Sequence, residues 1–151
     1  MVMRWYGKIL IPSDGGAHTL PAIQRGLEVA KLLNAEVTAL SVIDVRAFAS
    51  LSQGYSLPDM YSYLDAVAES AVELVRLEGR KLQVDVEMVV KRGSPAVDII
   101  EESKKHDLVV MGTSGRKGLP HLMMGSVAEK VVRFAECPVM VVKGPITTAN
   151  G

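Results

Sequence analysis

Apolar residues gather into five short runs, separated by longer segments in which they recur every three or four positions. The runs are Lys8–Pro12 and residues 36–43, 84–90, 107–112 and 138–143. The first, fourth and fifth are almost continuously apolar, which is typical of strands covered on both faces of a parallel sheet. The third alternates between apolar and polar residues, which favours a position at the edge of the sheet.

The segments between these runs carry the spacing of amphipathic helices. Residues 20–33 and 59–82 each place apolar side chains on one stripe. A third helix should open at Ser94, with Pro95 as its first helical residue. A fourth should begin at Ser126, where a glutamate three residues later predicts a capping box.

This alternation of strands and helices predicts a single α/β domain over residues 1–151, with its core at about residues 7–144. We expect a doubly wound fold: a five-stranded parallel sheet in the order 3-2-1-4-5, with helices on both faces. Residues 44–59 form one long connection, which is typical of a lid or binding loop. The tail, residues 145–151, is predicted to be disordered.

The predicted strand order brings two unusual turns together. The turn after the first strand reads "PSDGG", and the one after the fourth reads "GTSGRKGLPHLMMGS". Both would face the point where strand order reverses, which is where open α/β sheets bind ligands. Gly112, Gly115 and Gly125 would let the main chain approach a ligand closely.

The flanking residues suggest which ligand this crevice would accept. Ser126, at the start of a helix, would offer a hydroxyl and free N–H groups to an anion, with Arg116 and Lys117 adding positive charge. Asp14 could accept hydrogen bonds from sugar hydroxyls or hold a cation beside phosphates. A nucleotide fits this arrangement, although Gly112, Ser126 and Asp14 are equally explained as a turn, a helix cap and a turn former.

Standard catalytic motifs are absent from the sequence. There is no Walker A loop, no G-x-G-x-x-G after a strand and no G-x-S-x-G elbow. His18, His106 and His121 share no metal-ligand spacing with cysteine or aspartate, so no metal site is predicted. Only His121 lies in the glycine loop, and it is therefore the only histidine expected near the crevice.

Composition narrows the function classes further. Lys plus Arg equals Asp plus Glu, at 17 each, so no charge excess points to nucleic acid or to a membrane surface. Cys137 is the single cysteine and is expected to be an inert core thiol. No signal peptide and no apolar run long enough to span a bilayer are present, which favours a cytoplasmic protein.

The motifs together resemble the universal stress protein family. Gly112, Gly115 and the Gly125–Ser126 pair reproduce the spacing of that family's nucleotide-binding signature. "KILIPSDGG", "ALSVID", "KRGSPAVDII" and "GSVAEKVVRFAECPVMVVK" resemble its other conserved segments, so the similarity extends from Lys8 to Lys143. Departures are few: Ser114 stands where a histidine is frequent, and two glycines follow Asp14 where a Gly-Ser-like pair is usual.

The resemblance implies an ATP-binding member, with Mg or Mn as a possible companion of the phosphates. Asp14 would lie near the ribose or a metal–phosphate group, Val42 near the adenine, and the glycine loop around the phosphates. The residues that the resemblance and the glycine-loop charge assign to the nucleotide are Pro12, Ser13, Asp14, Val42, Met111, Gly112, Gly115, Arg116, Gly125, Ser126 and Val127.

The resemblance also implies a homodimer formed through the last strand, which begins at Pro138 and ends at Lys143. The sequence supports this independently, because an apolar edge strand without internal charge tends to be paired. We therefore expect a small nucleotide-binding regulatory protein of the stress response that signals to a partner protein. The alternatives are a slow ATP hydrolase, a nucleotide-free dimeric interaction module and a receiver-like phosphoacceptor, which would lack the acceptor aspartate after its third strand.

Overall fold

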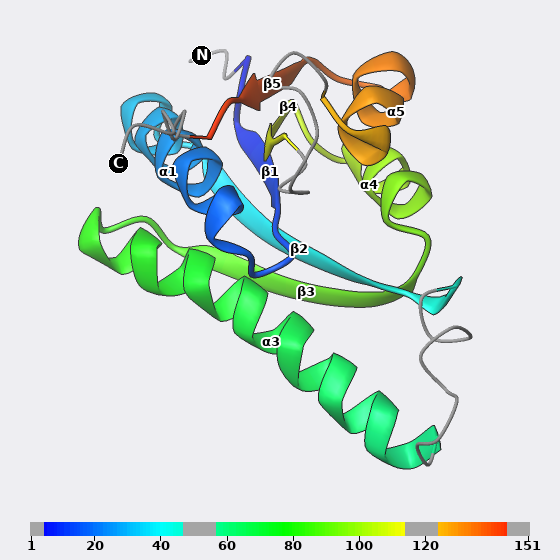
Figure 1. Cartoon of the computed structure of the whole chain (residues 1–151). Helices are drawn as coiled ribbons and strands as arrows, with labels where there is room; N and C mark the ends of the chain where they lie inside the picture. The colour runs from blue at the N-terminus through cyan, green and yellow to red at the C-terminus, as the bar shows by residue number, and fades with distance from the viewer. Residues whose placement is uncertain (1–4, 47–56, 114–123, 145–151) are drawn as a thin grey trace, which may run out of the picture.

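Five parallel strands form one sheet in the order β3-β2-β1-β4-β5. The computed structural model describes residues 5–46, 57–113 and 124–144 (Figure 1). The strands are β1 (Lys8–Pro12), β2 (Glu36–Asp44), β3 (Val86–Gly93), β4 (Leu108–Gly112) and β5 (Val139–Val142). The predicted sheet and its order are thus confirmed, including the edge position of β3. Residues 47–56 of the predicted long connection, and the C-terminal tail, lie outside the described residues.

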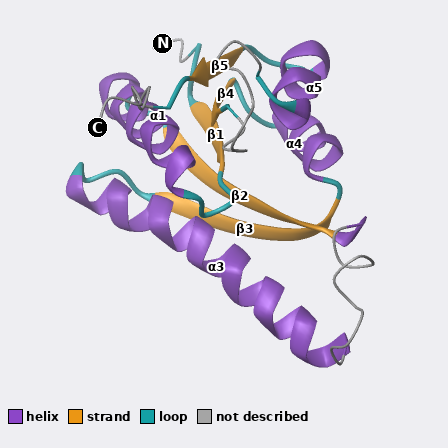
Figure 2. Cartoon of the chain, in the orientation of Figure 1, coloured by secondary structure: helices purple, strands orange, loops and turns teal. Residues whose placement is uncertain are grey.

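Helices cover both faces of the sheet, as predicted (Figure 2). The short helix η1 (Ala17–Thr19), α1 (Leu20–Leu33), α3 (Leu57–Lys81), α4 (Pro95–Ser103) and α5 (Ser126–Phe134) follow the strands in turn. Ile9 and Ile11 of β1 join a core cluster with α1 and α3. Leu10, between them, joins a second cluster with α4 and α5. Successive residues of β1 therefore face the two helical layers, which is why the strand is apolar throughout.

The third strand begins later than predicted and ends later too. Gly79 accepts backbone N–H bonds from Leu82 and Val84, and Gln83 adopts a left-handed conformation with φ 58°. This turn uses the residues from which we expected the strand to start. At its other end β3 remains paired with β2 as far as Gly93.

The predicted capping box at the start of α5 is wrong. Gly125 is the N-cap, with φ 84° and ψ 160°, and Ser126 is the first helical residue with no side-chain cap. The carboxylate of Glu129 instead contacts Arg133 at 3.0 Å. The predicted cap is shifted because Gly125 takes a backbone conformation essentially confined to glycine, which ends the loop one residue earlier.

The start of α4 agrees with prediction in its positions but not in its hydrogen bonds. Ser94 is the N-cap and Pro95 the first helical residue, yet the Ser94 side chain makes no cap bond. A different bond is present: Asp98 Oδ2 accepts the N–H of Ser94 itself at 3.0 Å. Gly93 leaves the space that this carboxylate fills, because a Cβ there would collide with Asp98.

Candidate functional site

A cleft of about 480 Å³ opens at the carboxyl ends of β1, β2 and β4, bordered by η1, α4 and α5. Most of the residues predicted to bind nucleotide line this one cleft. They are Pro12, Ser13, Asp14, Val42, Met111, Gly112, Ser126 and Val127. The fold thus brings together the turn after the first strand and the start of the last helix, although more than one hundred residues of chain separate them.

The turn after β1 is held by backbone and side-chain hydrogen bonds. Ser13 is buried, and its N–H donates to the carbonyl of Leu40 at 2.9 Å. Its Oγ accepts the N–H of Gly15 at 3.2 Å, and Asp14 Oδ1 accepts the N–H of Gly16 at 2.8 Å. Gly15 has φ 84° and lies against α3, so this position requires glycine. The Asp14 carboxylate is therefore presented at the cleft by a constrained turn.

His18 lines the cleft beside Asp14, which the sequence analysis did not anticipate. Its Nε2 lies 3.1 Å from Asp14 Oδ2, and its side chain is 33% exposed. The neighbouring Thr19 is buried and donates its hydroxyl to the Gly16 carbonyl at 2.6 Å. The spacing of four residues between Asp14 and His18 was the sequence feature that could have indicated this contact. It brings the two side chains together only because the chain turns into the short helix η1 between Asp14 and α1.

The β4 side of the cleft combines an apolar side chain with exposed main chain. Met111 is 5% exposed and packs into the core cluster under α4 and α5. Gly112 contributes its backbone to the cleft, but a Cβ there would point toward the His18 carbonyl, 3.4 Å away, and toward Ala22. These are ordinary contact distances, so the packing of β4 against η1 and α1 does not by itself require glycine at this position.

The N-terminus of α5 supplies the polar end of the cleft. The first backbone bond of this helix runs from the Glu129 N–H to the Gly125 carbonyl at 3.0 Å. The N–H groups of residues 126–128 therefore have no carbonyl to pair with inside the helix. Ser126, Val127 and Ala128 all line the cleft. These amides and the positive end of the helix dipole make a site suited to an anion.

The remaining wall of the cleft is apolar and packs on the core. Leu40, Val42, Ile99 and Met111 line it, and they belong to or pack against the cluster under α4 and α5. A cleft with one apolar wall, one carboxylate and one helix N-terminus is typical of small-molecule sites that accept a ring together with charged groups. Chemically, it can hold an aromatic base, a hydroxyl donor and an oxyanion at once.

Comparison with known proteins agrees with this geometry. Residues 6–143 match the family described as the universal stress protein family. Universal stress protein MJ0531 of Methanocaldococcus jannaschii is 39% identical over 142 residues, covering 93% of this chain and 84% of the relative. The chain belongs to the universal stress protein family.

Solved structures give the same fold. The hypothetical protein MJ0577 has a TM-score of 0.73 at 27% identity, covering 93% of this chain and 98% of that one. A universal stress protein family protein from Arabidopsis thaliana, solved with AMP bound, has a TM-score of 0.64 at 22% identity over 92% of both chains. At that identity the Arabidopsis protein shows the shared fold alone.

Three predicted site residues of this universal stress protein are not part of the cleft lining. Gly125 precedes the lining residues as the N-cap of α5. Gly115 and Arg116 lie outside the described residues, as does His121, the histidine expected near the crevice. These positions remain predictions from the sequence.

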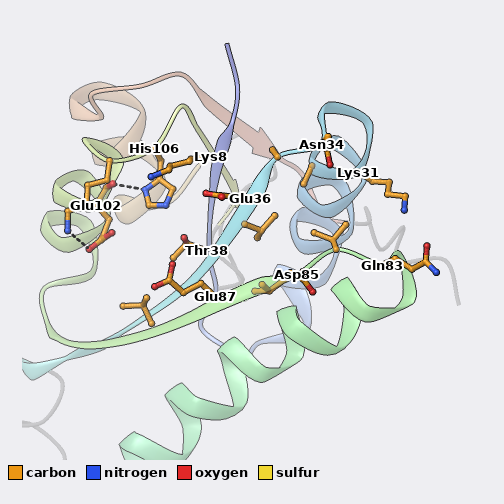
Figure 3. Close-up of a pocket in the computed structure, with 17 residues that line it drawn as sticks. Lys8, Lys31, Asn34, Glu36, Thr38, Gln83, Asp85, Glu87, Glu102 and His106 are labelled. Atoms are coloured by element: carbon orange, nitrogen blue, oxygen red, sulfur yellow. Dashed lines mark hydrogen bonds and ion pairs between the residues drawn. The ribbon is translucent and has the colours of Figure 1, made fainter. Parts of the chain in front are cut away.

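A larger hollow of about 970 Å³ lies at the opposite ends of the strands (Figure 3). Figure 3 shows side chains of both charges around it, including Lys8, Glu36, Glu87 and Glu102. Glu102 is already paired: its carboxylate contacts Lys91 and lies 3.7 Å from the Lys105 ammonium. Because ligands of open α/β sheets bind at the carboxyl ends of the strands, we favour the smaller cleft as the functional site.

The single cysteine, Cys137, lies outside the cleft lining. Burial raises the pKa of the half-buried Cys137 thiol and the negative charge of Asp107 raises it further, so the thiol stays protonated near neutral pH. Within the described ranges, no cluster of three or more His, Cys, Asp or Glu side chains could hold a metal ion. No helix in those ranges combines the length and apolar character needed to cross a bilayer.

Proposed function

We propose that this universal stress protein is a small regulatory protein that binds an adenine nucleotide, preferably ATP, in the cleft between β1 and α5. The observation that carries the proposal is the convergence of the Asp14 turn and the α5 N-terminus on one apolar wall. Neither feature alone would identify a ligand. Together they match the hydroxyls, the phosphates and the base of one molecule.

The apolar wall suits the base. Val42 and Met111 would flank the adenine ring, and backbone groups at Val42 would meet its polar edge. This assignment is supported by the place of both side chains in the cleft lining and by their packing on the core under α4 and α5. An AMP-bound family structure supports adenine as the base.

The polar ends of the cleft suit the sugar and the phosphates. Asp14 would accept a hydrogen bond from a sugar hydroxyl, and the N–H groups of Ser126 and Val127 would bind phosphate oxygens. Gly115 and Arg116 would complete the phosphate site. If Mg²⁺ or Mn²⁺ accompanies ATP, Asp14 is the described cleft carboxylate that fits it, and the nucleotide's own phosphates would supply further oxygen ligands.

A thermal melt with and without ATP and Mg²⁺ tests the proposal. ATP at about one hundred times its Kd should add about 2.7 kcal/mol to the unfolding free energy. For a chain of this size that raises Tm by roughly 5–10 °C. No upward shift at millimolar ATP would refute the proposal.

Ser126→Glu is the matched test of the phosphate site. Ser126 is exposed, and a carboxylate in the first turn of a helix is favourable to the helix itself, so the fold should remain stable. The added charge should nevertheless repel phosphates and abolish most of the ATP shift. Gln24→Glu adds the same charge on an exposed position of α1 and should leave the shift intact. Equal shifts in both variants would contradict the phosphate assignment.

We further propose a homodimer in which the β5 edges of two copies pair. In this sheet β5 is an edge strand, Met140 is 39% exposed, and Val132 and Phe134 of α5 are exposed as well. Met140→Lys should shift the mass measured by size-exclusion chromatography with light scattering toward the monomer. Met88→Lys, at the opposite edge strand, should not. A monomeric wild-type protein would refute this assembly.

Such a dimer would report nucleotide occupancy to a signalling partner. Slow hydrolysis of ATP is the weaker alternative, because the two candidate bases in the described cleft lining, Asp14 and His18, contact each other. Phosphate release on a seconds timescale in a single-turnover assay would reverse this ranking. Failure to bind any nucleotide would favour the dimeric interaction module instead.

A further inference from the structure

His18 contacts Asp14, the acidic residue that lines the cleft. It stands in η1, four residues after Asp14, and its Nε2 lies 3.1 Å from Asp14 Oδ2. The His18 side chain is 33% exposed, whereas the Asp14 side chain is 66% exposed. The ring is therefore the better-anchored partner, and the carboxylate is the one that would otherwise move.

Gly16 supplies the space that this ring occupies. A Cβ built on Gly16 would lie 2.6 Å from Nδ1 of His18 and closer still to Cε1. The backbone angles of Gly16, φ −70° and ψ 151°, are open to any residue. A side chain at position 16 would therefore displace the histidine ring without straining the main chain, so the glycine leaves room for the contact between His18 and Asp14.

Both carboxylate oxygens of Asp14 are consequently held. Oδ1 accepts the Gly16 N–H at 2.8 Å, and Oδ2 faces His18 Nε2. A carboxylate offers about four lone-pair directions, so each oxygen can still accept a hydrogen bond from a ligand. The two contacts restrict the rotation of the exposed Asp14 side chain before a ligand arrives. A ligand therefore does not have to pay for this loss of side-chain entropy when it binds.

We propose that His18 is a positioning residue that fixes the Asp14 carboxylate to accept a hydrogen bond from a sugar hydroxyl of the nucleotide. This inference rests on the proposed nucleotide-binding function. It assigns the cleft a ligand class, ribonucleotides over nucleotides that lack the sugar hydroxyls. It also attributes that selectivity to His18, through Asp14, and not to the phosphate site at α5.

The test compares ATP with 2′,3′-dideoxy-ATP by isothermal titration calorimetry. The wild type should bind ATP about tenfold or more tightly than the dideoxy analogue, as expected for a hydrogen bond to a charged group. His18→Phe keeps a ring over Gly16 but removes the nitrogen. It should lower the preference to about threefold or less while leaving the affinity for the dideoxy analogue unchanged. Because the preference is a ratio within one variant, a loss of folded protein cancels.

Gly16→Ala provides an independent route to the same effect. Its Cβ should displace the His18 ring, so this variant should lose the preference as His18→Phe does. In a His18→Ala background the same substitution should change the preference no further. His106→Phe is the matched control, since its Nδ1 contacts the Glu102 carbonyl at 2.8 Å, at the opposite end of the sheet, and the preference should survive.

The possible outcomes separate this inference from the proposed function. If the wild type binds ATP without preferring it to the dideoxy analogue, the inference is overturned and nucleotide binding stands. The same holds if His18→Phe keeps the preference, or if it weakens both ligands equally, which would indicate a structural role only. If the wild type binds neither ligand, the proposed function fails and the inference fails with it.

Discussion

Replacing Gly125 by alanine tests whether the start of α5 depends on a conformation that only glycine tolerates. Gly125 has φ 84° and ψ 160°, in a region of backbone space that other residues almost never occupy. Holding a residue with a Cβ there costs about 1–3 kcal/mol. Either the folded state carries this strain or the cap rearranges, and in both cases the unfolding free energy falls.

The size of the effect can be measured by urea denaturation followed by far-UV circular dichroism. For a chain of this length, a loss of about 1–3 kcal/mol corresponds to a fall in Tm of roughly 2–12 °C. If the cap rearranges, the N–H groups of residues 126–128 shift as well, so the ATP-induced stabilisation should also decrease. Two readouts, stability and ligand response, therefore come from one substitution.

Gly112→Ala is the control for Gly125→Ala. Gly112 has no positive φ, and the nearest atom to a Cβ there is the His18 carbonyl oxygen at 3.4 Å, an ordinary contact. The unfolding free energy of the Gly112→Ala variant should stay within about 0.5 kcal/mol of the wild-type value. If Gly125→Ala is as stable as Gly112→Ala, the start of α5 does not require the glycine conformation, and the reasoning about the anion site loses its structural basis.

Two further predictions concern packing outside the cleft lining. Lys91→Met removes the hydrogen-bonded partner of the buried Glu102 carboxylate, leaving Lys105 at 3.7 Å, and should cost about 1–3 kcal/mol at neutral pH. Burial opposes ionisation of Glu102, but its hydrogen bond to Lys91 and the nearby positive charges lower its pKa overall. The wild type should therefore lose this stabilisation as the pH falls below the ordinary glutamate range. The difference in unfolding free energy between wild type and Lys91→Met should shrink over the same range, because Glu102 becomes protonated in both. Urea titrations at several pH values measure this difference, and a difference that does not change with pH would contradict the assignment. Gly79→Ala should destabilise the fold by about 1–3 kcal/mol although alanine is the better helix former, because its Cβ would lie 2.8 Å from the Val84 carbonyl oxygen. Thermal melts measure the effect, and a more stable variant would show that the turn after α3 can shift to accommodate the Cβ.

Much of the fold was predictable because its signals are local and periodic. The continuous apolar character of β1 and β4 reports burial on both faces, and the alternation of β3 reports its edge position. The strand order 3-2-1-4-5 was expected because it is a common order for five-stranded doubly wound sheets. Once that order is known, the turn containing Asp14 and the helix start at Ser126 must meet at the reversal point, which is why most of the predicted site residues line one cleft.

The errors fall at the ends of elements, where the backbone conformation of one or two residues decides the outcome. Ser126 followed by Glu129 fits a capping box, but the backbone conformation of Gly125 moves the cap by one residue. Val84 fits a strand, but the turn closed by the Gly79 carbonyl excludes it. In each case the sequence pattern fits the element, but it does not specify which residue at the boundary takes a positive φ.

The sequence by itself was enough to predict the two helical layers, from hydrophobic periodicity, and the family, from glycine spacing and the neighbouring motifs. The strand order, and with it the meeting of the two turns, was expected because that order is common in this class of sheet. Only the tertiary structure shows that the His18 ring turns into the cleft to meet Asp14, in the space left by the missing side chain of Gly16. Spacing along a chain shows which residues can approach one another. Which pair makes contact depends on how η1 packs between β4 and the turn, and that is settled only when the whole domain has folded.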